Sequence, residues 1–137
     1  MTPVDDPLEP IEAALDDEGL LFQRDDDDEA MRISFKSEGD RYFVIAYRDD
    51  AEFLMVGSGW ALSPEIPLDR AYAIANNLNA RKKFVKTAIW EDDRDVLFTI
   101  ELCLSSFDDF GDHLVRLLEA IRDTAADFFD ALRRGEV

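Results

Sequence analysis

Apolar and polar residues alternate along three segments in the first half of the chain. In MRISFKS (31–37) the apolar side chains fall on one face of a strand and the polar ones on the other. RYFVIAYR (41–48) is apolar on both faces, as expected of a central strand, and FLMVGSGW (53–60) forms a third strand. Only EGD and DDAE separate these strands, which is too short for parallel crossovers. We therefore expect an antiparallel meander.

Two features qualify this meander. LLFQR (20–24) is a candidate for one more short strand, which the acidic run DDDDE (25–29) interrupts, so our strand count leaves it out. Gly57 and Gly59 lie on one face of the third strand. Glycine at such positions indicates a bulge or the close approach of another backbone or helix.

Three other segments have the spacing of helices with one buried face. Residues 5–19 predict a short helix that Gly19 ends. A second helix covers the region after two prolines and ends in NNLN (76–79), where asparagine tolerates the left-handed backbone that stops a helix. The third helix runs from about Phe107 to about Arg134, and Ser106 or Asp108 caps it.

The last helix is long for the sheet that it covers. At 1.5 Å per residue it measures about 40 Å, which exceeds the width of five strands at about 5 Å each. Part of its apolar stripe therefore reaches toward the first helix or a second subunit.

A hairpin completes the pattern, because KFVKTAIWE and DVLFTIELCLS are strand-like and only DDR joins them. The sequence predicts an α+β fold with an antiparallel five-stranded sheet packed by helices, in the order α-β-β-β-α-β-β-α. No internal repeat or long linker divides the chain, so we expect one domain over residues 1–137, with 1–5 as a frayed terminus.

The charge of the chain limits the classes of partner that it is expected to bind. There are 32 acidic and 15 basic side chains, giving a formal net charge of −17. This balance disfavours sequence-independent binding to nucleic acid and to anionic membranes, since both need Lys and Arg. A basic or amphipathic protein segment is the better electrostatic partner.

The single cysteine, Cys103, excludes an intramolecular disulfide and fits a reducing compartment. We see no signal peptide and no apolar run of the ~20 residues that cross a bilayer. A cytoplasmic location is the expectation.

Chemical motifs are weak. Counted from Asp25, the sixth and twelfth positions of an EF-hand loop would hold Ala30 and Lys36 instead of Gly and Glu. No phosphate-loop, zinc-protease or nucleophile-elbow motif is present, and nothing brings His113 to Cys103. We expect no enzyme, no cofactor and no metal. The alternatives are a regulatory domain that responds to a small ligand or a divalent metal, through the acidic turn and the NNLNARKK segment, and an enzyme that uses an Asp/Glu pair.

The cations Arg81, Lys82 and Lys83 have two interpretations. Cations are favoured at a helix C-terminus by about 0.3–1 kcal/mol each, which explains their position without a ligand. Alternatively, they bind an acidic segment of a partner or pair with carboxylates across a dimer interface. Trp60 and Trp90 lie at predicted strand ends, where large aromatic side chains are the first candidates for partner binding.

The chain resembles the YbjN-domain family of bacterial proteins, whose fold is similar to that of type III secretion chaperones. The resemblance rests on the three-strand block, on IPLDRAYAIANNLNARKKFVKTAIWEDDRDVLFTIEL with its NNLN, and on the long last helix. It implies a non-enzymatic, dimeric, protein-binding module, chaperone-like or an adaptor, in sensory transduction and stress response. By analogy the homodimer interface uses the second helix around Leu68, Tyr72 and Ile74, or the surplus stripe of the last helix at Phe128 and Phe129.

Overall fold

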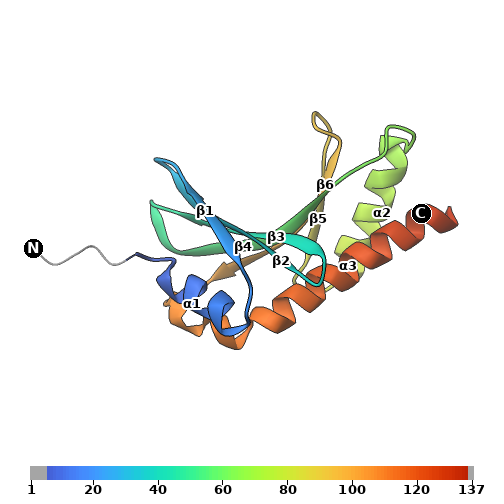
Figure 1. Ribbon diagram of the computed structural model, residues 1–137. Coiled ribbons are helices and arrows are strands. Elements are labelled where there is room, and N and C mark those ends of the chain that lie inside the picture. The colour runs from blue at the N-terminus through green and yellow to red at the C-terminus, as the bar shows by residue number, and fades with distance from the viewer. Residues whose placement is uncertain (1–5, 136–137) are drawn as a thin grey trace, which may run out of the picture. The chain divides into compact units, whose positions relative to one another are not determined.

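The computed structural model describes residues 6–135 and arranges six strands and three α-helices along the chain (Figure 1). The elements are α1 (Glu9–Asp17), β1 (Phe22–Asp26), β2 (Ala30–Ser37), β3 (Asp40–Tyr47), β4 (Asp50–Ala61), α2 (Leu68–Arg81), β5 (Lys86–Trp90), β6 (Asp95–Cys103), the 3-10 helix η1 (Phe107–Asp112) and α3 (Leu114–Arg134). The strands form one antiparallel sheet in the order β1-β2-β3-β4-β6-β5. The predicted α+β class and antiparallel meander are confirmed.

The sheet has six strands, so the predicted count of five is wrong. The extra strand is β1, and the acidic run does not prevent it, because Asp25 and Asp26 pair with Arg32 and Met31 of β2. The Asp27 side chain then stabilises the turn by accepting hydrogen bonds from the backbone amides of Glu29 and Ala30. As β1 is an edge strand, its charged side chains reach water and also discourage pairing with another chain.

The contacts divide the chain into two compact units. Unit 1 comprises the residues up to Val56 together with Glu101–Arg116, and unit 2 comprises Gly57–Ile100 together with the residues from Leu117 on. The prediction of a single domain stays a prediction. No helix in residues 6–135 is both long enough and apolar enough to cross a bilayer.

In unit 1 the strand register separates two faces. Arg24, Ile33 and Val44 are aligned across β1, β2 and β3, and Ile33 and Val44 are fully buried. On the same face the rings of Phe35 and Tyr42 stack with centroids 5.6 Å apart. Helix α1 lies on this side, since it pairs with Arg24 through Glu12. Helix α1 and its N-cap residue contribute three completely buried side chains, Leu8, Ile11 and Leu15.

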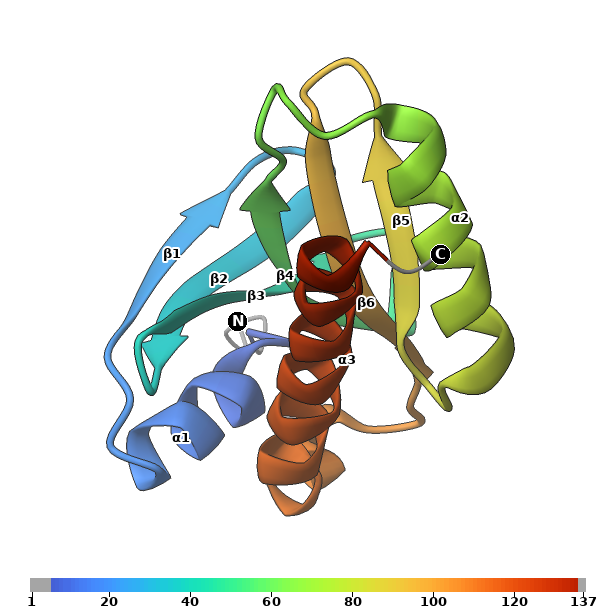
Figure 2. The same ribbon diagram turned by 90° about the vertical axis from the view of Figure 1, so that its right-hand side faces the viewer.

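Unit 2 packs α2 beside the edge strand β5 (Figure 2). The buried residues of α2 include Ala71, Ile74, Ala75 and Leu78. The aromatic rings of Phe98 and Phe128 meet edge to face at 5.6 Å and form the centre of this core. The expected close approach in β4 occurs at Gly59, where a Cβ atom would lie 2.8 Å from Cδ2 of Leu97. The approaching group is a side chain, not a backbone or a helix.

Two predicted helix boundaries are wrong. The NNLN segment does not end α2 with a left-handed residue: the helix continues to Arg81, and Lys82 at its end is extended. The long last helix does not start at Phe107, because η1 precedes α3. Gly111 has low helix propensity, and the room that it leaves is filled by α1, since a Cβ there would lie 3.4 Å from Cβ of Ala14. Gly19 does end α1, with φ +73°.

Candidate functional site

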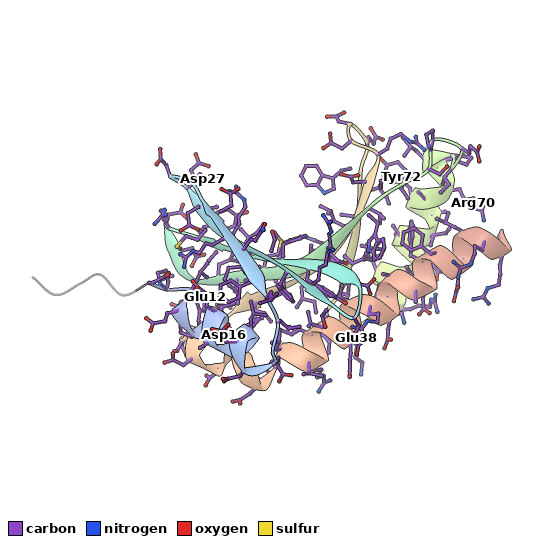
Figure 3. All side chains as sticks on the ribbon, in the orientation of Figure 1. Glu12, Asp16, Asp27, Glu38, Arg70 and Tyr72 are labelled. Atoms are coloured by element: carbon purple, nitrogen blue, oxygen red, sulfur yellow. The ribbon has the colours of Figure 1, made fainter. Side chains whose placement is uncertain are left out.

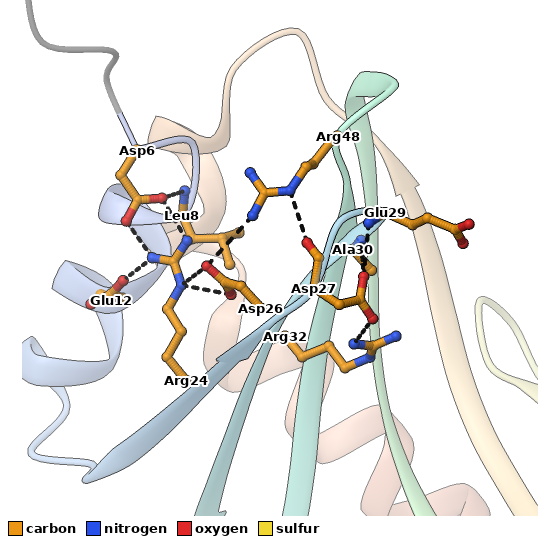
Figure 4. Close-up of polar contacts among 10 residues, drawn as sticks. All are labelled: Asp6, Leu8, Glu12, Arg24, Asp26, Asp27, Glu29, Ala30, Arg32 and Arg48. Carbon is orange, nitrogen blue, oxygen red and sulfur yellow. Dashed lines mark hydrogen bonds and ion pairs between the residues drawn. The ribbon is translucent and has the colours of Figure 1, made fainter.

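Arg24 is the centre of a charge cluster in unit 1 (Figure 4). Its guanidinium donates to Asp6, to Glu12 at 2.5 Å and to Asp26 at 3.0 Å, and its side chain is only 23% exposed. The hydrogen bond with Asp6 raises the pKa of Arg24 and lowers that of Asp6. Because Glu12 and Asp26 come from α1 and β1, the cluster joins this helix to the edge strand. Its role is architectural.

The acidic turn uses its central carboxylate inside the chain. Asp27 Oδ1 accepts from the backbone amides of Glu29 and Ala30 at 2.8 Å, and Oδ2 accepts from Arg32 at 2.7 Å (Figure 4). The Arg32 hydrogen bond, followed by the two amides, lowers the pKa of Asp27 to about 2. Within residues 6–135 no three His, Cys, Asp or Glu side chains are grouped to hold a metal ion.

The basic cluster is partly satisfied within unit 2. Arg81 lies in the last turn of α2 and donates to Asn77 Oδ1 at 2.6 Å, one turn earlier. Lys82 forms an ion pair with Asp127 of α3. Lys83 is exposed and has no ion-pair partner among the residues that the structure describes. Helix-end and intrachain contacts therefore account for Arg81 and Lys82, and Lys83 alone is left for a partner.

Phe84, which the sequence analysis did not single out, has an unusual backbone. Its φ is +72°, and the amide of Val85 donates to the carbonyl of Lys83 at 2.8 Å, which closes a three-residue turn around it. Such a γ-turn is rare and strained, and a bulky side chain there is an outlier. The Phe84 side chain is nevertheless 63% exposed. The sequence has no glycine or asparagine at this position that would signal such a turn.

The two tryptophans have different surroundings. Trp60 packs edge to face on Phe129 at 5.7 Å, and its indole N–H donates to Ser58 Oγ at 3.3 Å. Trp90, at the end of β5, is 57% exposed. Tyr72, which is labelled in Figure 3, donates a hydrogen bond from its hydroxyl to Glu91, the residue after Trp90, and this bond raises the pKa of Tyr72. Trp60 is therefore held at the edge of the core, whereas Trp90 remains available at the surface.

We call the exposed residues Lys83, Phe84 and Trp90, which lie between the end of α2 and the end of β5, the α2–β5 surface. Asn79 explains how α2 is fixed against β5 there. Its amide donates to the Thr87 carbonyl at 3.0 Å, and its Oδ1 accepts from the Thr87 amide at 2.8 Å. The Asn79 side chain thus makes the two backbone hydrogen bonds to Thr87 that a neighbouring strand would otherwise make at this edge of the sheet. The sequence showed the NNLN motif but gave no signal for this pairing, which depends on the tertiary structure.

The predicted interface residues are distributed between core and surface. Ile74 and Phe128 are 2% and 0% exposed within the chain, so they present almost no surface to a partner. Leu68 and Phe129 are partly exposed, and Tyr72 is 39% exposed. An interface at this side of unit 2 would consequently use Tyr72, Leu68 and Phe129.

Known structures share this fold at low sequence identity. An uncharacterized protein from Methanothermobacter thermautotrophicus is similar with a TM-score of 0.72 and 14% identity, over 96% of this chain and 99% of that one. YbjN from E. coli, described as a proposed transcription regulator, is similar with a TM-score of 0.65 and 15% identity, over 98% and 97%. No curated protein matches the chain in sequence.

One family model matches almost the whole chain. It covers residues 7–134, and its description is "YbjN: Putative bacterial sensory transduction regulator". The match includes both units and every element from α1 to α3. The chain therefore belongs to the YbjN family.

Proposed function

We propose that this chain is a non-enzymatic regulator that acts by binding other proteins, as a chaperone-like module or an adaptor in bacterial signalling or stress response. Its binding site is the α2–β5 surface. The observation that carries the proposal is Phe84, an aromatic side chain that is 63% exposed on a strained γ-turn. A residue held in such a backbone costs about 1–3 kcal/mol, and such residues cluster at functional sites.

The α2–β5 surface has one large aromatic side chain at each end of β5. Phe84 lies on the turn before this strand, and Trp90 is its last residue. Large aromatic residues are the side chains that dominate protein–protein binding energy. Because Asn79 already pairs with the backbone of Thr87, a partner binds here through side chains and does not extend the sheet at Thr87.

The partner is an amphipathic segment with basic residues. The net charge of −17 attracts cations at long range, and the exposed carboxylates of Glu91, Asp92 and Asp93 adjoin Trp90. The same charge disfavours nucleic acid and anionic membranes. The chain itself forms a homodimer, in which Tyr72, Leu68 and Phe129 lie at the interface.

The test compares variants that separate binding from folding. Proteins captured from a bacterial cytoplasm are identified, and the binding of each purified protein is measured by titration calorimetry. Phe84→Gly relieves the turn, since glycine adopts positive φ freely, and Trp90→Ala removes the other anchor. Leu21→Ala is the matched control, because Leu21 is 90% exposed but belongs to unit 1.

We expect Phe84→Gly and Trp90→Ala each to weaken binding by about tenfold or more, the usual size of a hot-spot loss, while Leu21→Ala binds normally. Thermal unfolding confirms that Phe84→Gly folds. A partner that binds Phe84→Gly and Trp90→Ala as tightly as the wild type would show that the α2–β5 surface is not the site.

A further inference from the structure

We propose a second, separate binding surface on unit 1, which takes an amphipathic helix of a partner protein with acidic residues at one end. This surface is the face of β2, β3 and β4 opposite to α1. We call it the open sheet face, and its residues are Arg32, Lys36, Arg41, Phe43, Ile45, Tyr47, Phe53 and Met55.

The register assigns these residues to one face. Ile33 and Val44 are aligned and buried on the α1 side. Strand side chains alternate, so the intervening pairs Arg32–Ile45 and Lys36–Arg41 point to the other side. In β4 the partly exposed Phe53 and Met55 alternate with the buried Leu54 and Val56.

The apolar part of the open sheet face is continuous. The rings of Tyr47 and Phe53 lie 5.6 Å apart, which links β3 to β4. Phe43 and Ile45 precede Tyr47 at alternate positions of β3, and all of these side chains are partly or fully exposed. From Arg41 to Tyr47 the strand extends about 20 Å, a length that about 13 residues of helix would cover. Amphipathic helices bury their apolar stripe on such sheet faces.

On β2 and β3 the charged side chains of this face are cationic, although the chain is strongly acidic; the neighbouring strand β1 adds Asp25, which is aligned with Arg32. The charged side chains that β2 and β3 direct to it are Arg32, Lys36 and Arg41. Arg32 is neutralised by Asp27 at 2.7 Å. Lys36 and Arg41 lie directly opposite each other, are both exposed, and have no ion-pair partner in residues 6–135. Two like charges in this cross-strand arrangement are unfavourable, and a carboxylate from a partner would relieve them.

This charge preference is opposite to that of the whole chain, which favours basic partners. An acidic group at one end of a docked helix would reach Lys36 and Arg41. The leucines or aromatic residues of the same helix would cover Phe43, Ile45 and Phe53. The occupant is therefore distinct from the segment proposed for the α2–β5 surface.

The probe is a fluorescent peptide of about 18 residues, about five helical turns, with a leucine stripe and a glutamate-rich first turn. Fluorescence anisotropy measures its binding to the full chain. Comparison peptides are a scramble of the same composition and a version with Lys in place of Glu. The protein variants are Lys36→Glu/Arg41→Glu, Lys36→Ser and the matched control Lys83→Glu, an exposed cation of unit 2.

We expect the amphipathic acidic peptide to bind, the scramble and the Lys version to bind about tenfold more weakly, and Lys36→Glu/Arg41→Glu to lose binding by a similar factor. Lys83→Glu leaves binding unchanged. Lys36→Ser weakens binding but does not lower the thermal midpoint, because it removes a like-charge pair; a purely structural lysine would lower it.

The proposal is overturned if the acidic peptide fails to bind, if the scramble binds equally well, or if the charge reversal has no effect. Competition by a single-stranded oligonucleotide that is lost in Lys36→Glu/Arg41→Glu would instead assign the surface to nucleic acid. Light scattering of the protein alone tests whether a second copy of the chain occupies this surface. If the protein is a dimer and Lys36→Glu/Arg41→Glu dissociates it, the open sheet face is a dimer interface. None of these outcomes depends on Phe84 or Trp90.

Discussion

Replacing Asn79 by alanine tests how α2 is held against the edge strand β5. The Asn79 side chain makes two hydrogen bonds to the backbone of Thr87, at 3.0 and 2.8 Å; both bonds are partly buried because Thr87 is buried, although Asn79 itself is exposed. A protein hydrogen bond contributes about 0.5–1.5 kcal/mol net, so the pair contributes about 2 kcal/mol. Asn79 also lies inside a helix, where alanine is favoured over asparagine by up to about 0.7 kcal/mol.

Asn76→Ala is the matched control. It lies in the same helix and is exposed, so it gains the same helix propensity without losing the Thr87 contacts. The difference between the two variants therefore isolates the two hydrogen bonds. Asn79→Asp is a second variant, which retains an acceptor for the Thr87 amide but replaces the donor to the Thr87 carbonyl with an oxygen.

The assay is urea unfolding followed by circular dichroism. For a difference of about 2 kcal/mol and an m-value of about 2 kcal/mol/M, the midpoint of Asn79→Ala lies about 1 M below that of Asn76→Ala. Asn79→Asp falls below the wild type as well. The amide proton of Thr87 exchanges faster in Asn79→Ala, since it loses its acceptor. Equal midpoints for Asn79→Ala and Asn76→Ala, with unchanged exchange at Thr87, would refute the role assigned to Asn79.

Three further predictions concern stability. Arg24→Met leaves a group of carboxylates without their cation and destabilises the chain by about 1.5–3 kcal/mol in urea unfolding, whereas Arg133→Met, whose side chain is 71% exposed, changes little; equal effects would contradict the proposed role of Arg24. Asp27 has a pKa lowered to about 2, so its stabilising contribution is complete above its unfolded-state pKa of about 3.9 and is lost as the pH falls toward 2. The midpoints of wild type and Asp27→Asn therefore converge with acidification, and a constant difference between pH 6 and pH 2 would be incompatible with this shift. Gly59→Ala brings a Cβ to 2.8 Å from Leu97 and costs about 1 kcal/mol, less when combined with Leu97→Val; strictly additive effects would show that the two residues do not touch.

Hydrophobic alternation predicted β2, β3, β4 and the β5–β6 hairpin because each strand has one buried face. It left β1 out of the strand count, although LLFQR was a candidate, since the aspartates of an edge strand carry no apolar pattern and their pairing depends on β2. It also missed the break between η1 and α3. The residues around Gly111 have the local sequence of a helix start, but Gly111 is packed against Ala14 of α1. Periodicity cannot report such contacts between distant segments.

The candidate site was foreseen in part. The sequence drew attention to Trp90 because it lies at a predicted strand end, and to the cations 81–83 because they are consecutive in an acidic chain. It gave no reason to select Phe84, since the backbone conformation of a turn without glycine is not encoded in a recognisable motif. The intrachain partners of Arg81, Lys82 and Trp60 likewise appear only after folding.

The central claim is that the α2–β5 surface binds another protein. Photo-crosslinking from benzoylphenylalanine placed at position 84 or at position 90, in living bacteria, tests it most directly. Position 13 is the control, because Ala13 is exposed on α1 in unit 1. We predict a discrete adduct of the same protein from positions 84 and 90, and none from position 13. Adducts of equal yield from all three positions, or from position 13 alone, would contradict the claim.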